Sequence, residues 1–268
     1  MKLTVLADNN TYIDMYYLGE PALSFYIEDG DEKILFDTGY SDVYLKNAEK
    51  MGIDLTRIDH IFLSHGHNDH NGGLRFLPAK KSSYHLIGHP GSLEYKEDEN
   101  GLQIGSFIDA EEIRKKCDIT FTKEVMRISE HLYYLGEIEI MNDFEKRYAI
   151  GKRIVYGSKE DDYILDDSAI VYKGKEGLFV ITGCSHAGIC NIIEYAKKVC
   201  EEKRISGVIG GFHLFDADER LQRTIEYLKE NQIPLLYPCH CVSLKAKIEM
   251  GKQLDIREVG VGLRLEIQ

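Results

Sequence analysis

The sequence lacks a long hydrophobic run. The chain of 268 residues contains no stretch of about 18 apolar residues, the length that a helix needs to cross a bilayer. The first residues are also unlike an export signal, because the acidic Asp8 comes before any apolar stretch of the required length. We therefore expect a cytoplasmic protein that makes no contact with a membrane.

Clusters of basic residues and low-complexity tracts are also absent. The chain has 33 Lys and Arg against 45 Asp and Glu, a formal net charge of −12, and no basic block. This balance disfavours tight binding along a long nucleic acid, although a local basic pocket would suffice to hold one phosphate. With 43% hydrophobic residues, the chain is typical of a globular domain. We expect one main unit, residues 1–268, with a small-molecule partner, and a homo-oligomer stays open.

Cysteines are few and scattered, and without an export signal they do not predict a disulfide framework. We expect reduced thiols. Three of them lie within two residues of a histidine and would bring sulfur close to a metal: Cys184, Cys239 and Cys241. The other three are expected to fill apolar space: Cys117, Cys190 and Cys200.

One dense group of metal-ligating side chains stands out. His65, His67, Asp69 and His70 fall within six residues, directly after the apolar stretch 61–64. Neutral imidazole and carboxylate are the donors that an ion such as Zn²⁺ prefers, and two adjacent ions need about this many donors close together. A polar loop that holds three histidines by chance does not explain alternating ligands backed by a carboxylate. The motif therefore predicts a metal centre.

Alternating apolar residues predict strands in the first part of the chain. We expect a strand, a hairpin, a helix capped by Ser41 or Asp42 and closed by Gly52, and a strand that leads into the histidines. The expected ranges are 3–7, 22–27, 33–36, 43–51 and 58–63. A helix beginning near Asp69 would follow, and the glycines at 72–73 would let the backbone approach the metal site closely.

The pattern changes over residues 79–163 to short strands, a polar loop and a short helix. We expect strands at 84–88, 119–121 and 131–135 and a helix at 110–116. The segment 79–163 is predicted to be an inserted small α/β subdomain or lid within the main domain. Substrate specificity is expected to reside there.

Strands and helices alternate regularly from Ala169 onward, which predicts layered α/β packing. The expected strands are 169–172, 178–182, 207–209, 235–237 and 259–267, and the expected helices are 189–201, 218–231 and 244–250. Three of the strands lead into a histidine: His186, His213 and His240. Because ligands of α/β sheets bind at the carboxyl ends of strands, these histidines and the His65 loop are expected to share one crevice.

These segments together resemble the metallo-β-lactamase superfamily. The resemblance rests on Leu-Phe-Asp-Thr-Gly at 35–39, on the histidine motif within 63–74, and on the later single histidines at strand ends. It implies an α/β fold, the αββα sandwich of that superfamily. Segments 182–188, 210–214 and 238–241 further resemble one branch, the metal-dependent hydrolases similar to an archaeal 7,8-dihydropterin-6-methyl-4-(β-D-ribofuranosyl)aminobenzene 5′-phosphate synthase. An inserted small α/β subdomain also fits that branch.

The resemblance implies roles for individual residues. It assigns six metal ligands: His65 and His67 for a first ion, Asp69 and His70 for a second, and His186 and His240 from the other half of the chain. The ions would be one or two Zn²⁺. Asp37 would hydrogen-bond a ligand histidine or its loop, and so set the orientation of the ring.

One position departs from the superfamily pattern. Most members carry a bridging aspartate after a Thr-Gly pair, and here Cys184 follows Thr-Gly at 182–183. The hairpin strand before it also lacks a histidine and is preceded only by the polar residues of 166–168. Either His186 replaces the missing donor, which we favour, or Cys184 coordinates as a thiolate. Without the bridging carboxylate, the second ion would bind more weakly, or would be Fe or Mn instead of Zn²⁺.

Three interpretations of His213 are open. It is a metal ligand, or it donates a proton and contacts a phosphate beside the metals, or it is a hydrogen-bonded histidine at a strand end with no role in chemistry. By analogy with His186 and His240, we favour a functional role.

Three functions follow from these residues. In the first, a metal-dependent hydrolase cleaves a small phosphoester or related ester, Asp69 orients the attacking water, and His213 protonates the leaving group. In the second, a transferase of the pterin-synthase type displaces pyrophosphate. In the third, suggested by the cysteines near the histidines, the protein senses metal or redox state without turnover.

Overall fold

Alternating apolar side chains divide the core into three layers. In β3 (Glu32–Phe36), Phe36 faces a layer between two sheets, whereas Leu35 faces an outer layer. In β13 (Gly177–Thr182), Phe179 faces the same middle layer as Phe36, and its neighbours face the opposite outer layer. Two sheets therefore face each other, and each has a second apolar face for helices. This is the αββα sandwich that the sequence predicts.

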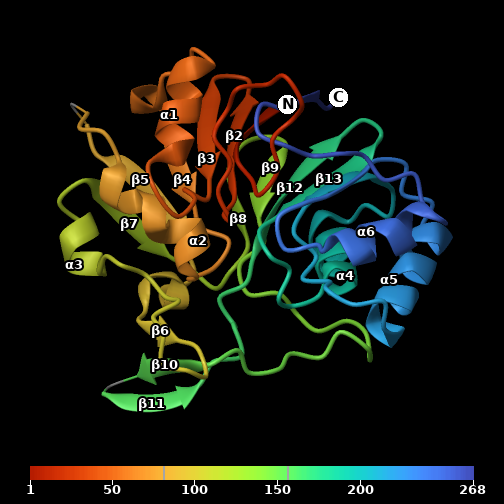
Figure 1. The fold of residues 1–268 in the computed structure, drawn as a ribbon. Coiled ribbons are helices and arrows are strands. Elements are labelled where there is room, and N and C mark those ends of the chain that lie inside the picture. The colour runs from red at the N-terminus through yellow and green to blue at the C-terminus, as the bar shows by residue number, and fades with distance from the viewer. Residues whose placement is uncertain (81, 156) are drawn as a thin grey trace.

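A computed structural model describes residues 1–80, 82–155 and 157–268 (Figure 1). The other strands of the first sheet are β1 (Lys2–Ala7), β2 (Ser24–Asp29), β4 (His60–Phe62), β5 (Tyr84–Gly88), β7 (Cys117–Phe121) and β16 (Arg264–Glu266). Their order is β16-β1-β2-β3-β4-β5-β7. The other strands of the second sheet are β8 (Met126–Arg127), β9 (Leu132–Tyr134), β12 (Ala169–Gly174), β14 (Ile205–Gly210) and β15 (Leu236–Pro238). Their order is β15-β14-β13-β12-β9-β8.

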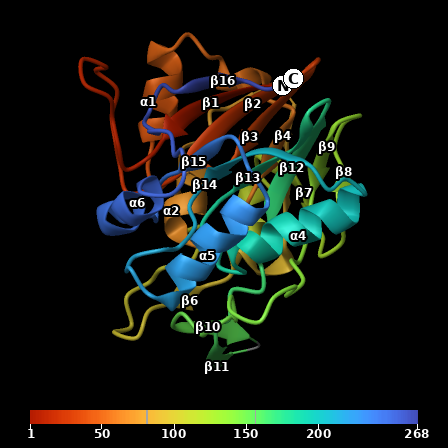
Figure 2. The same cartoon turned by 90° about the vertical axis from the view of Figure 1, so that its right-hand side faces the viewer.

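Helices cover the outer faces of both sheets (Figures 1 and 2). Those next to the first sheet are α1 (Val43–Lys50), α2 (Asn68–Asn71) and α3 (Ala110–Ile113). Those on the second sheet are α4 (Ile189–Cys200), α5 (Glu219–Glu230) and α6 (Leu244–Gly251). Short 3₁₀ helices occur at Leu55–Arg57, Gly72–Phe76 and Pro90–Leu93. Among the described residues, no helix has the length and apolar character needed to cross a membrane.

The segment 79–163 contributes to three sheets instead of forming one separate unit. Within it, β5 and β7 extend the first sheet, and β8 and β9 extend the second. Among the described residues, one small sheet lies outside the two large ones, with β6 (Lys96–Glu97), β10 (Lys152–Val155) and β11 (Ser158–Asp161) in the order β11-β10-β6 (Figure 1). The inserted subdomain or lid over 79–163 stays a prediction, and the small sheet with its flanking loops is the part of this segment that stands apart from the two large sheets.

Two local expectations need correction. The last strand is shorter than 259–267, because Gly262 (φ 94°) turns the chain before β16 begins. The close approach expected at residues 72–73 exists, but the neighbour is the loop after β3. A Cβ on Gly73 would lie 2.0 Å from the carbonyl oxygen of Thr38, so that loop excludes any side chain at 73.

Parallel pairing brings the predicted site residues to one edge of the sandwich. β3 pairs in parallel with β4, and on the other sheet β13, β14 and β15 also pair in parallel. The carboxyl ends of these strands lead into the segments that carry Asp37, His65, His186, His213 and His240. As expected for α/β sheets, the candidate site lies at these ends.

Candidate metal centre

Strained backbone marks the segments that follow these strands. Asp37, Ser185, His213 and His240 have φ values of 57°, 59°, 50° and 52°. Residues other than glycine rarely adopt this left-handed conformation, which costs about 1–3 kcal/mol each and persists where the surroundings enforce it. Four such residues at one edge of the sandwich indicate a built site.

The first group of donors consists of His65, His67 and His186. One ring nitrogen of each lies within 4.8 Å of the others, and all three side chains are buried. Nε2 of His65 lies 3.0 Å from Nδ1 of His67. Nε2 of His67 and both ring nitrogens of His186 are buried without a hydrogen-bond partner among the described residues. Buried polar atoms are rarely left unpaired, so this group fits a metal ion.

The second group consists of Asp69, His70 and His240, again with one donor atom each within 4.8 Å of the others. Nε2 of His70 lies 3.2 Å from Nε2 of His240. Oδ2 of Asp69 lies 3.3 Å from Nε2 of His240 and 3.7 Å from Nε2 of His70. The structure thus brings together all six residues that the resemblance assigns as metal ligands, in two adjoining groups.

Sulfur lies between these groups. Sγ of Cys184 is 3.2 Å from Nε2 of His70, and Cys184 forms one donor group with His65 and His70 and another with His240 and Cys241. Burial raises the pKa of the Cys184 thiol, whereas the neighbouring thiol and His240 outweigh burial and lower the pKa of Cys241 to about 7. All six cysteines are free, as expected.

Asp37 anchors the first half of the site. Its Oδ2 accepts hydrogen bonds from Nδ1 of His70 at 2.7 Å and from Oγ of Ser64 at 2.7 Å, and its Oδ1 accepts from the backbone N–H of Ser64 at 2.7 Å. Oγ of Ser64 also lies 2.9 Å from Nδ1 of His65. Since Nδ1 of both histidines is engaged, Nε2 of each is left for a metal. This is the contact that the sequence analysis expects of Asp37.

The residues that hold His240 were not found from the sequence. Oδ2 of Asp8 accepts a hydrogen bond from the backbone N–H of His240 at 3.0 Å, and Oδ1 of Asn9 accepts from Nδ1 of His240 at 3.0 Å. The asparagine oxygen therefore orients Nε2 of His240 toward the second group. Asp8 and Asn9 follow β1, far from His240 in the chain, and no motif surrounds them.

A buried ion network behind the histidine loop was also missed. Oδ2 of Asp166 accepts from the backbone N–H of Gly66 at 2.7 Å, directly between His65 and His67. Nζ of Lys96 lies 2.7 Å from Oδ1 of Asp166 and 3.1 Å from Oδ2 of Asp162. Lys96 is only 1% exposed. The network connects the small sheet, through Lys96, to the loop of the first donor group.

The protonation states of the site suit a cation. Burial lowers the pKa of His65, His67 and His186, that of His67 to about 3, so these imidazoles are neutral at pH 7. Burial raises the pKa of Asp69, but His70 and His240 outweigh it and the pKa is lowered. Burial also lowers the pKa of His70, and Asp69 and Asp37 outweigh it and raise the value to about 9. A metal would displace the proton of His70, since metal ligands must be deprotonated.

His213 lies beside the donor groups and belongs to neither, among the described residues. Its ring centroid is 4.5 Å from that of His186, and its Nδ1 lies 3.1 Å from the hydroxyl of Tyr148. Burial and the nearby Arg220 lower its pKa to about 4. A neutral ring with this partner favours the role of a hydrogen-bond donor over that of a charged acid.

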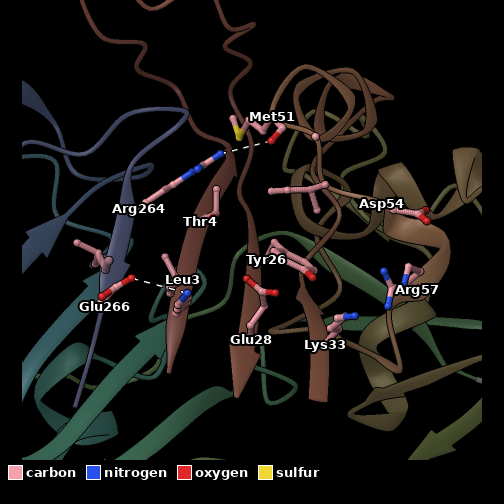
Figure 3. A pocket seen from close by; sticks show the side chains of 14 residues that line it. Leu3, Thr4, Tyr26, Glu28, Lys33, Met51, Asp54, Arg57, Arg264 and Glu266 are labelled. Atoms are coloured by element: carbon pink, nitrogen blue, oxygen red, sulfur yellow. Dashed lines mark hydrogen bonds and ion pairs between the residues drawn. The ribbon is translucent and has the colours of Figure 1, made fainter. Parts of the chain in front are cut away.

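Both donor groups open onto one pocket of ≈ 560 Å³. The donors and neighbouring site residues that line it are His67, Asp69, Cys184, His186, His213, His240 and Cys241, together with Asp8 and Asn9. A second hollow of ≈ 410 Å³ lies at the opposite ends of β1 and β3, where Lys2, Lys33, Arg57 and Arg264 line it (Figure 3). None of the described residues that line this second hollow is a histidine or cysteine. It therefore lacks the histidine and cysteine donors that distinguish the candidate metal centre.

The fold and the site together define a class of protein, an αββα sandwich that carries two groups of histidine and carboxylate donors at its strand ends. Residues 18–197 match the family model of the metallo-beta-lactamase superfamily, and the chain belongs to that superfamily. Members of the superfamily bind divalent metals, usually zinc.

Three known proteins are similar to this chain over nearly its whole length. The chain is 30% identical over 253 residues to the uncharacterized protein MJ0448 of Methanocaldococcus jannaschii, covering 93% of this chain and 94% of the relative. It is 30% identical over 262 residues to the 7,8-dihydropterin-6-methyl-4-(beta-D-ribofuranosyl)-aminobenzene-5′-phosphate synthase of the same organism, covering 92% and 89%. The solved structure of Tm1679, described as a metal-dependent hydrolase of the beta-lactamase superfamily, matches with a TM-score of 0.87 and 31% identity over 100% and 99% of the two chains. The predicted superfamily is confirmed, and the predicted resemblance to the branch of the archaeal synthase is confirmed as a similarity.

Replacing Asp37 by asparagine is expected to weaken zinc binding by about 10- to 100-fold, because the partners that orient ligand histidines contribute this much to metal affinity. A competition titration against a chromophoric chelator measures the change. Asp42→Asn is the control, since this carboxylate precedes α1 and pairs with the exposed Lys46 of that helix. Equal zinc affinity of the wild type and the Asp37 variant would contradict the role.

Acid is expected to destabilise the metal-free protein as the pH falls from about 6.5 to about 4. The folded-state pKa values of His65, His67, His186 and His213 are lowered, so these histidines gain protons first in the unfolded chain. Burial raises the pKa of Asp167 to about 6, which acts in the opposite direction. The pKa values of Asp8 and Glu94 are raised as well, whereas those of Asp69 and Asp166 are lowered and act with the histidines. The four histidines and these two carboxyls outweigh the three carboxyls with raised pKa values, and stability therefore falls with the pH. Urea unfolding in the presence of a chelator measures the free energy at each pH.

His186→Gln is expected to reduce the slope of this dependence, because it removes one group whose pKa differs between the folded and unfolded states. The exposed His131 offers a matched control, His131→Gln, which should leave the slope unchanged. A free energy of unfolding that stays constant between pH 6.5 and 4.5 would show that the buried histidines are not neutral in the folded protein.

Proposed function

We propose that this protein is a metal-dependent hydrolase that acts on a small phosphoester or related ester. One observation carries the proposal: two adjoining donor groups, each with three protein ligands, face a single pocket. The pocket beside these donors has room for water and a small substrate, as a catalytic site requires, which argues against a sensor without turnover. The metal proposed is one or two Zn²⁺, with Fe or Mn as alternatives.

The residues that would hold the ions are the two donor groups, His65, His67 and His186 for the first and Asp69, His70 and His240 for the second. When bound, such ions supply water activation and polarisation of a phosphoryl or carbonyl oxygen. Asp69 lines the pocket with a lowered pKa, so its ionised carboxylate is able to accept a hydrogen bond from an attacking water.

His213 and Tyr148 would lie beside the bound substrate. If the Tyr148 hydroxyl donates to Nδ1 of His213, the ring carries its proton on Nε2 and is able to donate it to a substrate or leaving-group oxygen. With a pKa of about 4, the ring stays neutral at pH 7. The proposed contribution of His213 is therefore a hydrogen bond, with proton donation completed through Tyr148 or water.

A transferase of the pterin-synthase type is the second candidate. The observation that favours it is the similarity to the archaeal synthase over nearly the whole of both chains. In this reaction the same centre would hold the pyrophosphate of a pterin substrate while an aminobenzene ribotide displaces it. Both candidates use the same ligands and differ in the nucleophile, water or the ribotide.

The experiment is a comparison of both reactions on the same zinc-loaded preparation. Phosphomonoesters, phosphodiesters and other esters are tested for hydrolysis, and a pterin pyrophosphate is tested with and without an aminobenzene ribotide. Chelator-treated protein is the control for metal dependence. Turnover of an ester by loaded protein alone supports the hydrolase. Condensation without ester hydrolysis supports the synthase, and failure of any pterin to bind in a calorimetric titration excludes it.

A further inference from the structure

We propose that Cys184 is a thiolate ligand shared by the two metal positions, where most superfamily members carry a bridging carboxylate, and that Cys241 adds a second sulfur on the His240 side. The inference rests on the proposed function, because it concerns the same centre. It reverses the sequence-based preference for His186 as the replacement of the missing donor.

The geometry gives His186 and Cys184 different roles. His186 is grouped with His65 and His67 alone, on the first position. Sγ of Cys184 lies within 4.8 Å of a donor atom of His65 on one side and of His240 on the other, and 3.2 Å from Nε2 of His70. Sγ of Cys184 therefore lies near donor atoms of both groups, as a bridging ligand must.

The carboxylates near the hairpin strand are already engaged. Asp166 binds the backbone N–H of Gly66 and the ammonium of Lys96, and Oδ2 of Asp167 accepts from the backbone N–H of Ala187 at 2.8 Å. Within the described part of the chain, Asp69 supplies the only carboxylate in any of the donor groups. A bridge between the metals consequently falls to sulfur.

The backbone around the two cysteines leaves room for sulfur at this place. A Cβ on Gly183 would lie 2.1 Å from Oγ of Ser64, and a Cβ on Gly211 would lie 2.4 Å from Sγ of Cys241. Both glycines thus allow the segments after β13 and β14 to close over the site. Sγ of Cys241 is held 3.6 Å from the carbonyl oxygen of Cys184.

Sulfur changes the metal that the centre should select. Thiolate ligands favour Zn²⁺ and iron, whereas all-oxygen sites suit Mn²⁺ and Mg²⁺. Each thiol that coordinates releases one proton to solvent, because the thiolate is the ligand. The inference therefore predicts that Zn²⁺ displaces Mn²⁺ from the wild type and does so less readily from a variant without Cys184.

The test is the absorption spectrum of the Co²⁺-substituted protein, in which a thiolate ligand produces charge-transfer bands in the near ultraviolet. The wild type is expected to show these bands, Cys184→Ser to lose most of their intensity, and Cys241→Ser to lose a smaller part. Cys190→Ser is the matched control, since Cys190 is also buried but lies in α4 and in none of the donor groups. It should keep the full spectrum.

Absence of the bands in the wild type, or an unchanged spectrum in Cys184→Ser, would overturn the inference. If Cys184→Ser fails to fold, X-ray absorption of the zinc-loaded wild type decides, because Zn–S scattering at about 2.3 Å is distinct from Zn–N at about 2.0 Å. The hydrolysis assay separates the two proposals. Sulfur ligation without turnover rejects the proposed function alone, and turnover with only nitrogen and oxygen ligands rejects this inference alone.

Discussion

His67→Ala is expected to remove about one equivalent of bound metal and to lower kcat/KM for ester hydrolysis by about 10³-fold or more. His67 is one of only three donors in the first group, and its buried Nε2 has no other partner among the described residues. Metal ions contribute several kcal/mol to transition-state stabilisation, and each 1.36 kcal/mol corresponds to a factor of about ten in rate. Elemental analysis and steady-state kinetics on the same preparation measure both effects.

His131→Ala serves as the control for the loss of a histidine, since its side chain is half exposed and lies outside the donor groups. Loss of hydrolysis with the metal content intact would contradict the assignment of His67 as a ligand. Unchanged metal content together with unchanged hydrolysis would also place the centre elsewhere.

Lys96→Met is expected to lower the free energy of unfolding by about 3–5 kcal/mol, the usual cost of breaking a buried ion pair on one side. Lys96 is buried with Asp166 and Asp162. Burial by itself would lower the pKa of Lys96, but the two carboxylates outweigh this effect and raise the pKa. Methionine would leave both carboxylates buried without a cation. Urea unfolding of the chelator-treated protein measures the loss without interference from bound metal.

Lys152→Met is the matched control in the same small sheet. Lys152 pairs with Asp161, but both side chains are about half exposed, and exposed pairs contribute at most about 1 kcal/mol. An equal loss in the two variants would show that the buried network has no special weight. A larger loss for Lys96→Met accompanied by weaker zinc binding would show that Asp166 also positions the loop around Gly66.

The core architecture was predictable because it depends on local patterns. The short continuous apolar runs at 34–36 and 178–181 are typical of strands that are buried on both faces, and the structure places the side chains of each run in two apolar layers. The helix expected at 218–231 is confirmed as α5, and the structure adds that the Asp218 side chain caps it by accepting a hydrogen bond from the backbone N–H of Leu221.

The predicted insertion differs from the structure because strand pairing is a long-range property. The strands at 84–88 and 132–134 are short and flanked by irregular segments, which suggests a separate unit. Their hydrogen-bond partners, β4 and β12, lie in the two large sheets, and no local pattern specifies them.

The candidate ligands were visible in the sequence, but the residues that hold them were not. Motif spacing identifies His65, His67 and His70, because ligands carried by one loop must lie close together in the sequence. Asp8, Lys96 and Tyr148 contact the site from segments tens to hundreds of residues away. Their residue types are common on surfaces, and only their burial or contacts in the folded chain distinguish them.

The sequence by itself indicated a candidate metal centre at one end of an α/β sandwich, since ligand spacing and strand alternation are properties of neighbouring residues. Only the tertiary structure decided how the donors divide between two positions. It placed His186 with the first group and Cys184 between the two groups, although these residues are separated by a single residue. The reason is geometric: the turn after β13, with Ser185 in the left-handed conformation, sends the two side chains to different places, and adjacency in the chain does not reveal that.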